Sequence, residues 1–128
     1  MIRAALVFAA LLLLVAPAAA HHGGGTFDGS KEIKLTGTFT GLDLINPHSW
    51  IYLEVKDDKG QPTVWALEAT NPLGLQRNGI KREDVRPGDA IKVRCHLLRD
   101  GSNGCLLGYV TPFHGDPARG HGVEKEWD

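Results

Sequence analysis

Stretches in which apolar and polar residues strictly alternate constrain the fold of this chain more than any other feature of its sequence. A period of two is typical of a β-strand with one buried face. The first such stretch covers residues 32–44, where a change of phase after Gly41 predicts a β-bulge. Similar patterns predict strands at residues 49–56, 63–69, 91–97 and 105–111. The sequence therefore predicts an all-β protein.

Turn signals separate the predicted strands and suggest how they are connected. The segment Asp57-Asp58-Lys59-Gly60 predicts a hairpin, and residues 99–104 form a second dense cluster of turn residues. Residues 73–77 lie between Asn71-Pro72 and Asn78-Gly79, which predicts one short helix. Three antiparallel strands, a short helix and two further strands are the element order of a small five-stranded OB-like Greek-key barrel. A small open sandwich is the alternative.

The first 20 residues have the organisation of a secretory signal peptide. Arg3 precedes an apolar run at residues 4–15, and small residues follow at 16–20. The run is shorter than the roughly 20 residues that a membrane span needs, although an uncleaved anchor is the alternative. Cleavage fits after Ala18 or after Ala20. The sequence thus predicts a periplasmic or secreted protein with no membrane span after cleavage.

The remaining chain is expected to form one domain between two loosely held ends. Residues 21–31 are rich in histidine and glycine and are predicted to be flexible, and residues 32–113 are predicted to form the barrel. Residues 114–128 hold many charges and are predicted to be a loosely ordered tail. His96 is expected to face solvent from its strand, and His114 and His121 are expected to be solvated.

The two cysteines of the chain are predicted to form a disulfide. Cys95 and Cys105 are equidistant from Asp100 in the predicted turn, which would place them opposite one another across a hairpin. The oxidising compartment implied by the signal peptide permits the bond. Two buried thiols are the alternative.

Imidazole groups suggest a metal site, with copper as the metal. Pro47 fixes the corner that presents His48, and cleavage after Ala20 would give His21 a free α-amine beside its own imidazole. Among divalent ions, Cu(II) binds such nitrogen ligands most strongly. The predicted ligands are His21 and His48, with His22 as an alternative ligand and Trp50 as a neighbouring wall.

A metal-free binding module is the alternative function. Its binding face would hold a protein or small ligand on the barrel around Trp50, Tyr52, Trp65 and Glu68, although Trp65 itself is expected in the core or at the barrel mouth. No catalytic motif stands out, so the protein is not expected to be an enzyme. The net charge of -1 disfavours nucleic-acid binding.

Several short motifs together resemble a family of short exported bacterial proteins that are assigned to a domain of unknown function. In order, the motifs are His21-His22, Phe27-Asp28, Leu35-Thr36-Gly37-Thr38, Asn46-Pro47-His48-Ser49-Trp50, Trp65-Ala66-Leu67-Glu68 and Pro87-Gly88-Asp89. The resemblance covers His21 to about Thr111 and implies an exported OB-like barrel without an established activity. This chain differs from the family pattern in the glycines after His22 and in having the two cysteines.

Overall fold

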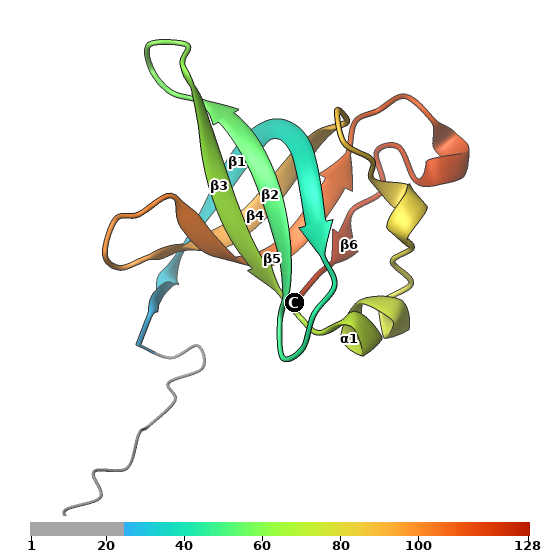
Figure 1. Ribbon diagram of the computed structural model, residues 1–128, viewed down its shortest axis with the longest axis horizontal. Helices are drawn as coiled ribbons and strands as arrows, with labels where there is room; N and C mark the ends of the chain where they lie inside the picture. Colours follow the sequence, from blue (N-terminus) through green and yellow to red (C-terminus); the bar gives the residue numbers. More distant parts are fainter. Residues whose placement is uncertain (1–24) are drawn as a thin grey trace, which may run out of the picture.

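The computed structural model describes residues 25–128, in which six strands form a single sheet. The strands are β1 (Phe27–Asp43), β2 (Ser49–Lys56), β3 (Pro62–Ala69), β4 (Ala90–Leu98), β5 (Gly104–Pro112) and β6 (Lys125–Glu126). Their order is β3-β2-β1-β4-β5-β6, and β3 also pairs with β5, so β1 to β5 close into a barrel (Figure 1). The short helices α1 (Pro72–Arg77) and η1 (Arg82–Asp84) connect β3 to β4. The predicted OB-like barrel is confirmed.

The long strand β1 is shared by both halves of the barrel. Its first part pairs with β4 and its second part with β2, and Thr38 lies opposite a residue of each. The predicted bulge is present, although the register shifts between Phe39 and Gly41 rather than after Gly41. β1 also begins earlier than predicted, because Phe27 is buried opposite Leu98. Phe27, which was predicted to lie in the flexible segment 21–31, is therefore part of the barrel wall, whereas no residue of 28–31 is buried.

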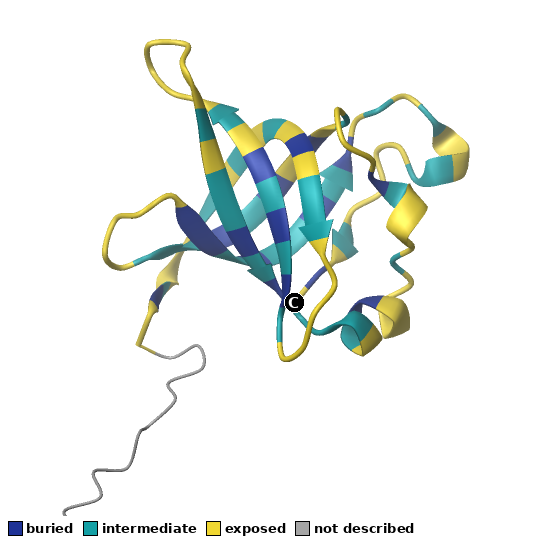
Figure 2. Cartoon of the chain, viewed as in Figure 1, coloured by how far each residue is buried: buried dark blue, intermediate teal, exposed yellow. Residues whose placement is uncertain are grey.

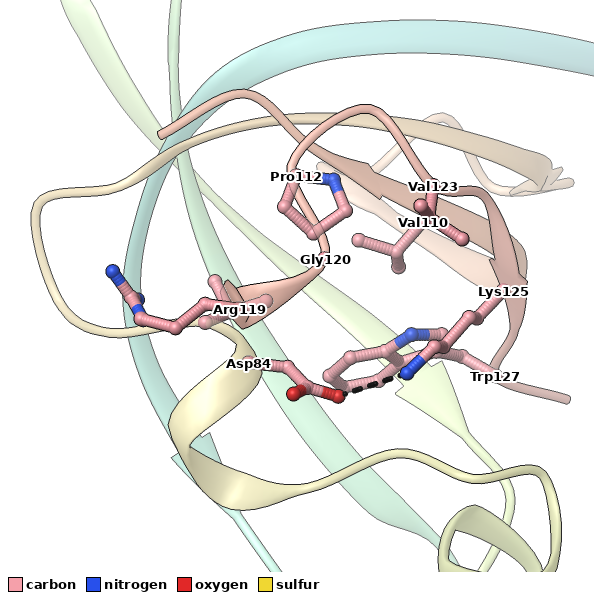
Figure 3. Close-up of a pocket in the computed structure, with 9 residues that line it drawn as sticks. Asp84, Val110, Pro112, Arg119, Gly120, Val123, Lys125 and Trp127 are labelled. Atoms are coloured by element: carbon pink, nitrogen blue, oxygen red, sulfur yellow. Dashed lines mark hydrogen bonds and ion pairs between the residues drawn. The ribbon is translucent and has the colours of Figure 1, made fainter. Parts of the chain in front are cut away.

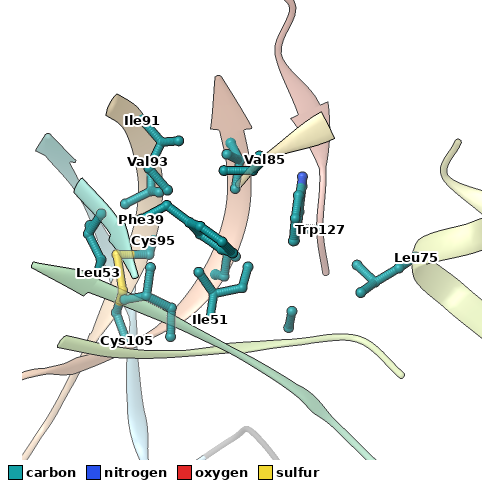
Figure 4. Close-up of a cluster of buried hydrophobic side chains, with 14 residues drawn as sticks. Phe39, Ile51, Leu53, Leu75, Val85, Ile91, Val93, Cys95, Cys105 and Trp127 are labelled. Atoms are coloured by element: carbon teal, nitrogen blue, oxygen red, sulfur yellow. A yellow bond between two sulfur atoms is a disulfide. The ribbon is translucent and has the colours of Figure 1, made fainter. Parts of the chain in front are cut away.

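The core lies inside the barrel and continues toward α1 (Figure 4). Alternation along the strands points one face of each inward, as predicted from the sequence. α1 closes one end, with Leu75 buried against the core. Pro72 begins this helix, and the side chain of Asn71 accepts a hydrogen bond of 2.8 Å from the N–H of Gly74. The buried core residues include Phe39, Ile51, Leu53, Leu67, Ile91, Val93, Leu107 and Val110.

The disulfide between Cys95 and Cys105 is present, but the predicted register is wrong. Its Cα atoms are 5.8 Å apart, and both residues are buried. Cys105 lies opposite Leu97 and Cys95 lies opposite Leu107, so the two cysteines are diagonal neighbours on the inner face. The hairpin is centred on Gly101, which adopts a φ of +78°, instead of on Asp100. Diagonal neighbours on one face still come close enough to bond.

The C-terminal segment is ordered against the barrel, so the prediction of a loosely ordered tail is wrong. Trp127 is only 3% exposed and packs into the core between Val85 and Leu75 (Figure 4). Its backbone N–H donates to Gly108 at 2.8 Å, and its carbonyl accepts from Thr70 at 2.9 Å. The short strand β6 pairs with β5 and so attaches the segment to the barrel. The segment was predicted to be loose because most of its residues are charged or polar. The single large indole ring of Trp127 buries enough apolar surface to hold it against the barrel.

Polar contacts also hold this segment in place. Lys125 forms an ion pair with Asp84 (Figure 3), and Arg119 forms one with Asp89, in which both side chains are largely buried. His114 is half-buried rather than solvated, and its Nε2 atom lies 3.0 Å from the carbonyl oxygen of Asp84. His121 is exposed, as expected, and its Nδ1 atom accepts a hydrogen bond from a backbone N–H.

Arg119 helps to keep the carboxyl group of Asp89 ionised by lowering its pKa. Burial raises the pKa of Asp89, but the hydrogen bond from the backbone N–H of Arg86 and the contact with Arg119 outweigh it. The net effect is a pKa below the ordinary value for aspartate. Folding therefore favours the ionised carboxylate.

Removing the disulfide is expected to destabilise the protein. The variant in which Cys95 and Cys105 are both replaced by Ala should lose about 2 to 3 kcal/mol of unfolding free energy, because the unfolded chain gains freedom in a short loop. Urea denaturation measures the change, and reduced wild-type protein separates the bond from the packing of its sulfur atoms. Finding two free thiols by mass spectrometry in protein purified from an oxidising compartment would contradict the disulfide.

Removing the arginine beside Asp89 is expected to cause a pH-dependent loss of stability. Arg119→Met should lower the unfolding free energy at neutral pH by about 1 to 3 kcal/mol. Because the pKa of Asp89 is depressed in the folded state, the stabilisation is full above its unfolded value of about 4 and is lost as the pH falls through the folded value. Urea denaturation across a pH series measures the difference, with Lys59→Met as an exposed control. A difference independent of pH would contradict this account.

Candidate functional site

His48 lies at the corner between β1 and β2 and faces a carboxylate from β3. Its Nε2 atom is 3.4 Å from Oε1 of Glu68, and the side chains are 32% and 15% exposed. The corner delivers His48 immediately before Ser49, which pairs with Ala69, the residue after Glu68. The antiparallel register of β2 and β3 therefore brings the imidazole and the carboxylate together. The Asn46–Pro47 peptide bond at this corner is cis.

Glu68 belongs to a row of outward-facing residues that crosses the barrel wall. It lies opposite Trp50 in β2 and opposite Leu106 in β5. Leu106 in turn lies opposite His96 in β4. Inward-facing neighbours such as Leu67 are fully buried, so the row occupies the outer face. An imidazole, a carboxylate and an indole thus meet at one end of the row.

Tyr52 borders this site on the outer face of β2. Its hydroxyl group donates a hydrogen bond of 2.9 Å to Oδ2 of Asp43. This bond, together with burial and the negative charge of Asp43, raises the pKa of Tyr52 above its ordinary value. Tyr52 therefore remains a neutral phenol around neutral pH, fixed at the edge of the site.

Trp65 does not share the predicted binding face with the other two aromatic residues. It lies opposite Leu53, whose side chain is fully buried, and packs against the hydrophobic core. Trp50 and Tyr52 occupy alternate positions on β2 and point outward. The face predicted from the sequence is thus reduced to Trp50, Tyr52 and Glu68, and Trp65 occupies the core position that the sequence also suggested.

Only one of the three predicted metal ligands lies in the part of the chain that the structure describes. His21 and His22 lie outside it, whereas His48 is placed at the corner. No group of three or more His, Cys, Asp or Glu side chains within residues 25–128 is arranged to hold a metal ion. His48 and Glu68 can at most form part of such a site.

The contact between Glu68 and His48 was not predicted from the sequence. The turn at residues 57–60 contained a usable signal, because counting outward from a tight hairpin fixes the strand register. The observed pairs Val55 with Thr63 and Trp50 with Glu68 follow one such register. His96, by contrast, lies on the outer face as predicted, with its Nδ1 atom 2.9 Å from the carbonyl oxygen of Lys31.

A family model matches residues 9–107, which is most of the chain. The matching family is described as a family of unknown function, DUF6152. The chain belongs to this family. Membership agrees with the resemblance found in the sequence and brings no known activity. No curated protein matches the chain.

One solved structure with a similar fold is the mitochondrial single-stranded DNA binding protein Rim1 from S. cerevisiae. It is 12% identical, with a TM-score of 0.49, and the match covers 67% of this family member and 97% of the Rim1 chain. We draw nothing from this similarity about what the present protein binds. Within residues 25–128, no helix has the length and apolar character needed to cross a membrane.

Proposed function

We propose that this protein is exported and binds Cu(II) through its mature N-terminus and His48, in a non-enzymatic role. The signal-peptide pattern of residues 1–20 supports export to the periplasm or the medium. The disulfide between Cys95 and Cys105 also suits an oxidising compartment. Cleavage after Ala20 would make His21 the first residue.

The observation that carries the proposal is the contact between His48 and Glu68. Imidazole ligands of metals almost always donate their other ring N–H to a carboxylate, a carbonyl or water. The Nε2 atom of His48 faces Oε1 of Glu68, so in this proposal Nδ1 binds the metal and Glu68 fixes the ring. Glu68 is largely buried, which strengthens its attraction for a polarised N–H group.

The amino-terminal residue supplies the remaining ligands. The α-amine of His21 has an ordinary pKa near 8, so a metal displaces one weakly held proton near neutral pH. Together with its own imidazole it offers two nitrogen ligands, and His48 offers a third. Such nitrogen sets favour Cu(II) over other divalent ions. His22 is the alternative second imidazole.

The length of the N-terminal segment is compatible with this arrangement. The described chain begins beside the β4–β5 hairpin, where the N–H of Arg99 donates to the carbonyl of Thr26 at 3.0 Å. From there, successive pairings through β4, β5 and β3 lead to β2, which is about 19 Å across the strands at roughly 4.8 Å per strand. Arg99 also lies three residues beyond His96, the β4 residue in the row of Glu68, which adds an offset of about 10 Å along the strands. Residues 21–26 span about 17 Å when extended. In this proposal, an extended N-terminal segment and the reach of the imidazole side chains of His21 and His48 together bridge this distance.

A metal-free binding module is the second candidate. The partly exposed Trp50 lies directly opposite Glu68 and near Tyr52 on the same face of β2. The two rings form an aromatic surface, and the carboxylate of Asp43 is fixed beside it by its hydrogen bond to Tyr52. Aromatic residues of this kind are enriched at protein interfaces. A protein or a small ligand would then contact the outer face of β2 without copper.

Copper titration of the mature protein distinguishes the two candidates. Intact mass should first show that the exported chain begins at His21. His48→Ala and a version with one added residue before His21 should each bind Cu(II) more weakly, with altered absorption spectra. Glu68→Gln should lose about 10-fold or more in affinity, as expected for a residue that orients a ligand.

His96→Ala is the matched control, because it removes another outer-face imidazole and should leave copper affinity unchanged. Removing Gly23 and Gly24 should also abolish the contribution of His48, since the shortened segment cannot reach it. Comparable affinity and spectra in all variants would exclude the site, since neither the free amine nor His48 would then matter.

A further inference from the structure

The strand β1 loses its neighbour on one side in its second half. Thr38 still lies opposite both Glu54 in β2 and Ala90 in β4. Phe39 donates its N–H to the carbonyl of Asp89 and accepts from the N–H of Gly88, each at 2.8 Å. Beyond this point, residues 41–43 pair with β2 alone. One edge of β1 is therefore open.

Leu42 directs its backbone toward this open edge. The N–H of Ser49 donates to Thr70, on the β3 side of β2. Backbone groups alternate along an antiparallel strand, so those of Ile51 also face β3. Leu42 lies opposite Ile51, and its N–H and C=O therefore point away from β2. They provide one donor and one acceptor for a further strand.

The open edge borders an apolar groove between β1 and the segment around η1. This groove has a volume of about 390 Å³, and Phe39, Leu42 and Val85 contribute its apolar lining. A second hollow of about 270 Å³ shares Leu42 with it and extends toward α1. Ile45, just beyond β1, is 51% exposed. Figure 2 shows the end of β1 mostly at intermediate burial (teal) and the loop that follows it exposed (yellow). An extended chain could bury alternate side chains along this path.

The far wall of the groove is positively charged. Arg82 and Arg86 line it and are exposed, and neither side chain has an ion pair or hydrogen bond with another residue in the described part of the chain. Glu83 is the one carboxylate among the groove's lining residues. Two uncommitted guanidinium groups beside a strand edge favour a negatively charged occupant.

We propose that this groove binds an extended acidic segment of a partner protein, which adds to β1 as a further strand. Backbone bonds to Leu42 would supply the pairing, apolar side chains would fill the groove, and carboxylates would meet Arg82 and Arg86. A second copy of this chain pairing β1 with β1 would bring four arginines together, which disfavours it. The proposal does not depend on copper binding.

The test uses the full mature protein and a short blocked peptide of alternating glutamate and valine. At millimolar peptide, the NMR amide signals of Gly41, Leu42 and Asp43 should shift, and hydrogen exchange at Leu42 should slow. The double variant Arg82→Glu, Arg86→Glu should bind at least about tenfold more weakly, as expected from losing close charge pairs. Lys56→Glu with Lys59→Glu is the matched control at the distant hairpin and should bind normally.

A peptide with lysine in place of glutamate should not bind. Equal binding of both peptides would overturn the charge argument, and signal changes without protection of Leu42 would overturn strand addition. Decanoate binding in the groove in place of the peptide would instead assign it to a small apolar carboxylate. Dimerisation in place of peptide binding would assign it to a second copy. Circular dichroism of each variant confirms that it is folded, so a loss of binding reports the loss of the substituted side chains and not unfolding.

Discussion

The barrel depends on one strand, β1, serving both of its halves. Around Thr38 this strand passes from β4 to β2, and at Gly37 the backbone of β2 comes so close that a Cβ atom would overlap the carbonyl oxygen of Glu54. A residue with a side chain cannot occupy that position without moving β2. The close approach lets β1 curve from one partner to the next. The bulge between Phe39 and Gly41 adds to the bend.

The parts of the fold that depend on local patterns could be predicted from the sequence. Alternation located all five barrel strands, and Asn71-Pro72 located α1, because these signals lie within a few residues. The cysteine pairing was correct although the register was not, since Cys95 and Cys105 share a face in either register. Trp127 was missed because its burial depends on contacts with Thr70 and Gly108, which are far away in the sequence.

The candidate site could be predicted only in part, for the same reason. Asn46-Pro47 identified His48 as a residue at a rigid corner, and that information is local. The carboxylate facing it comes from another strand and depends on the β2–β3 register. Trp65 was grouped with Trp50 because both are aromatic, but a shift of one position along a strand reverses the face. Assigning a shared surface requires the register as well as the alternation.

The same change of partner that closes the barrel also leaves an open strand edge at Leu42. Exposed strand edges invite pairing with other chains, and proteins usually protect them with charged or proline residues on the edge itself. Here Leu42 and Leu44 are apolar, and the carboxylate of Asp43 between them accepts a hydrogen bond from Tyr52. Positive charges lie across the groove on Arg82 and Arg86. Like charges on two copies repel self-pairing but leave the edge accessible to an acidic chain. The edge is thus protected against one class of partner and kept open to another, as a selective binding surface requires.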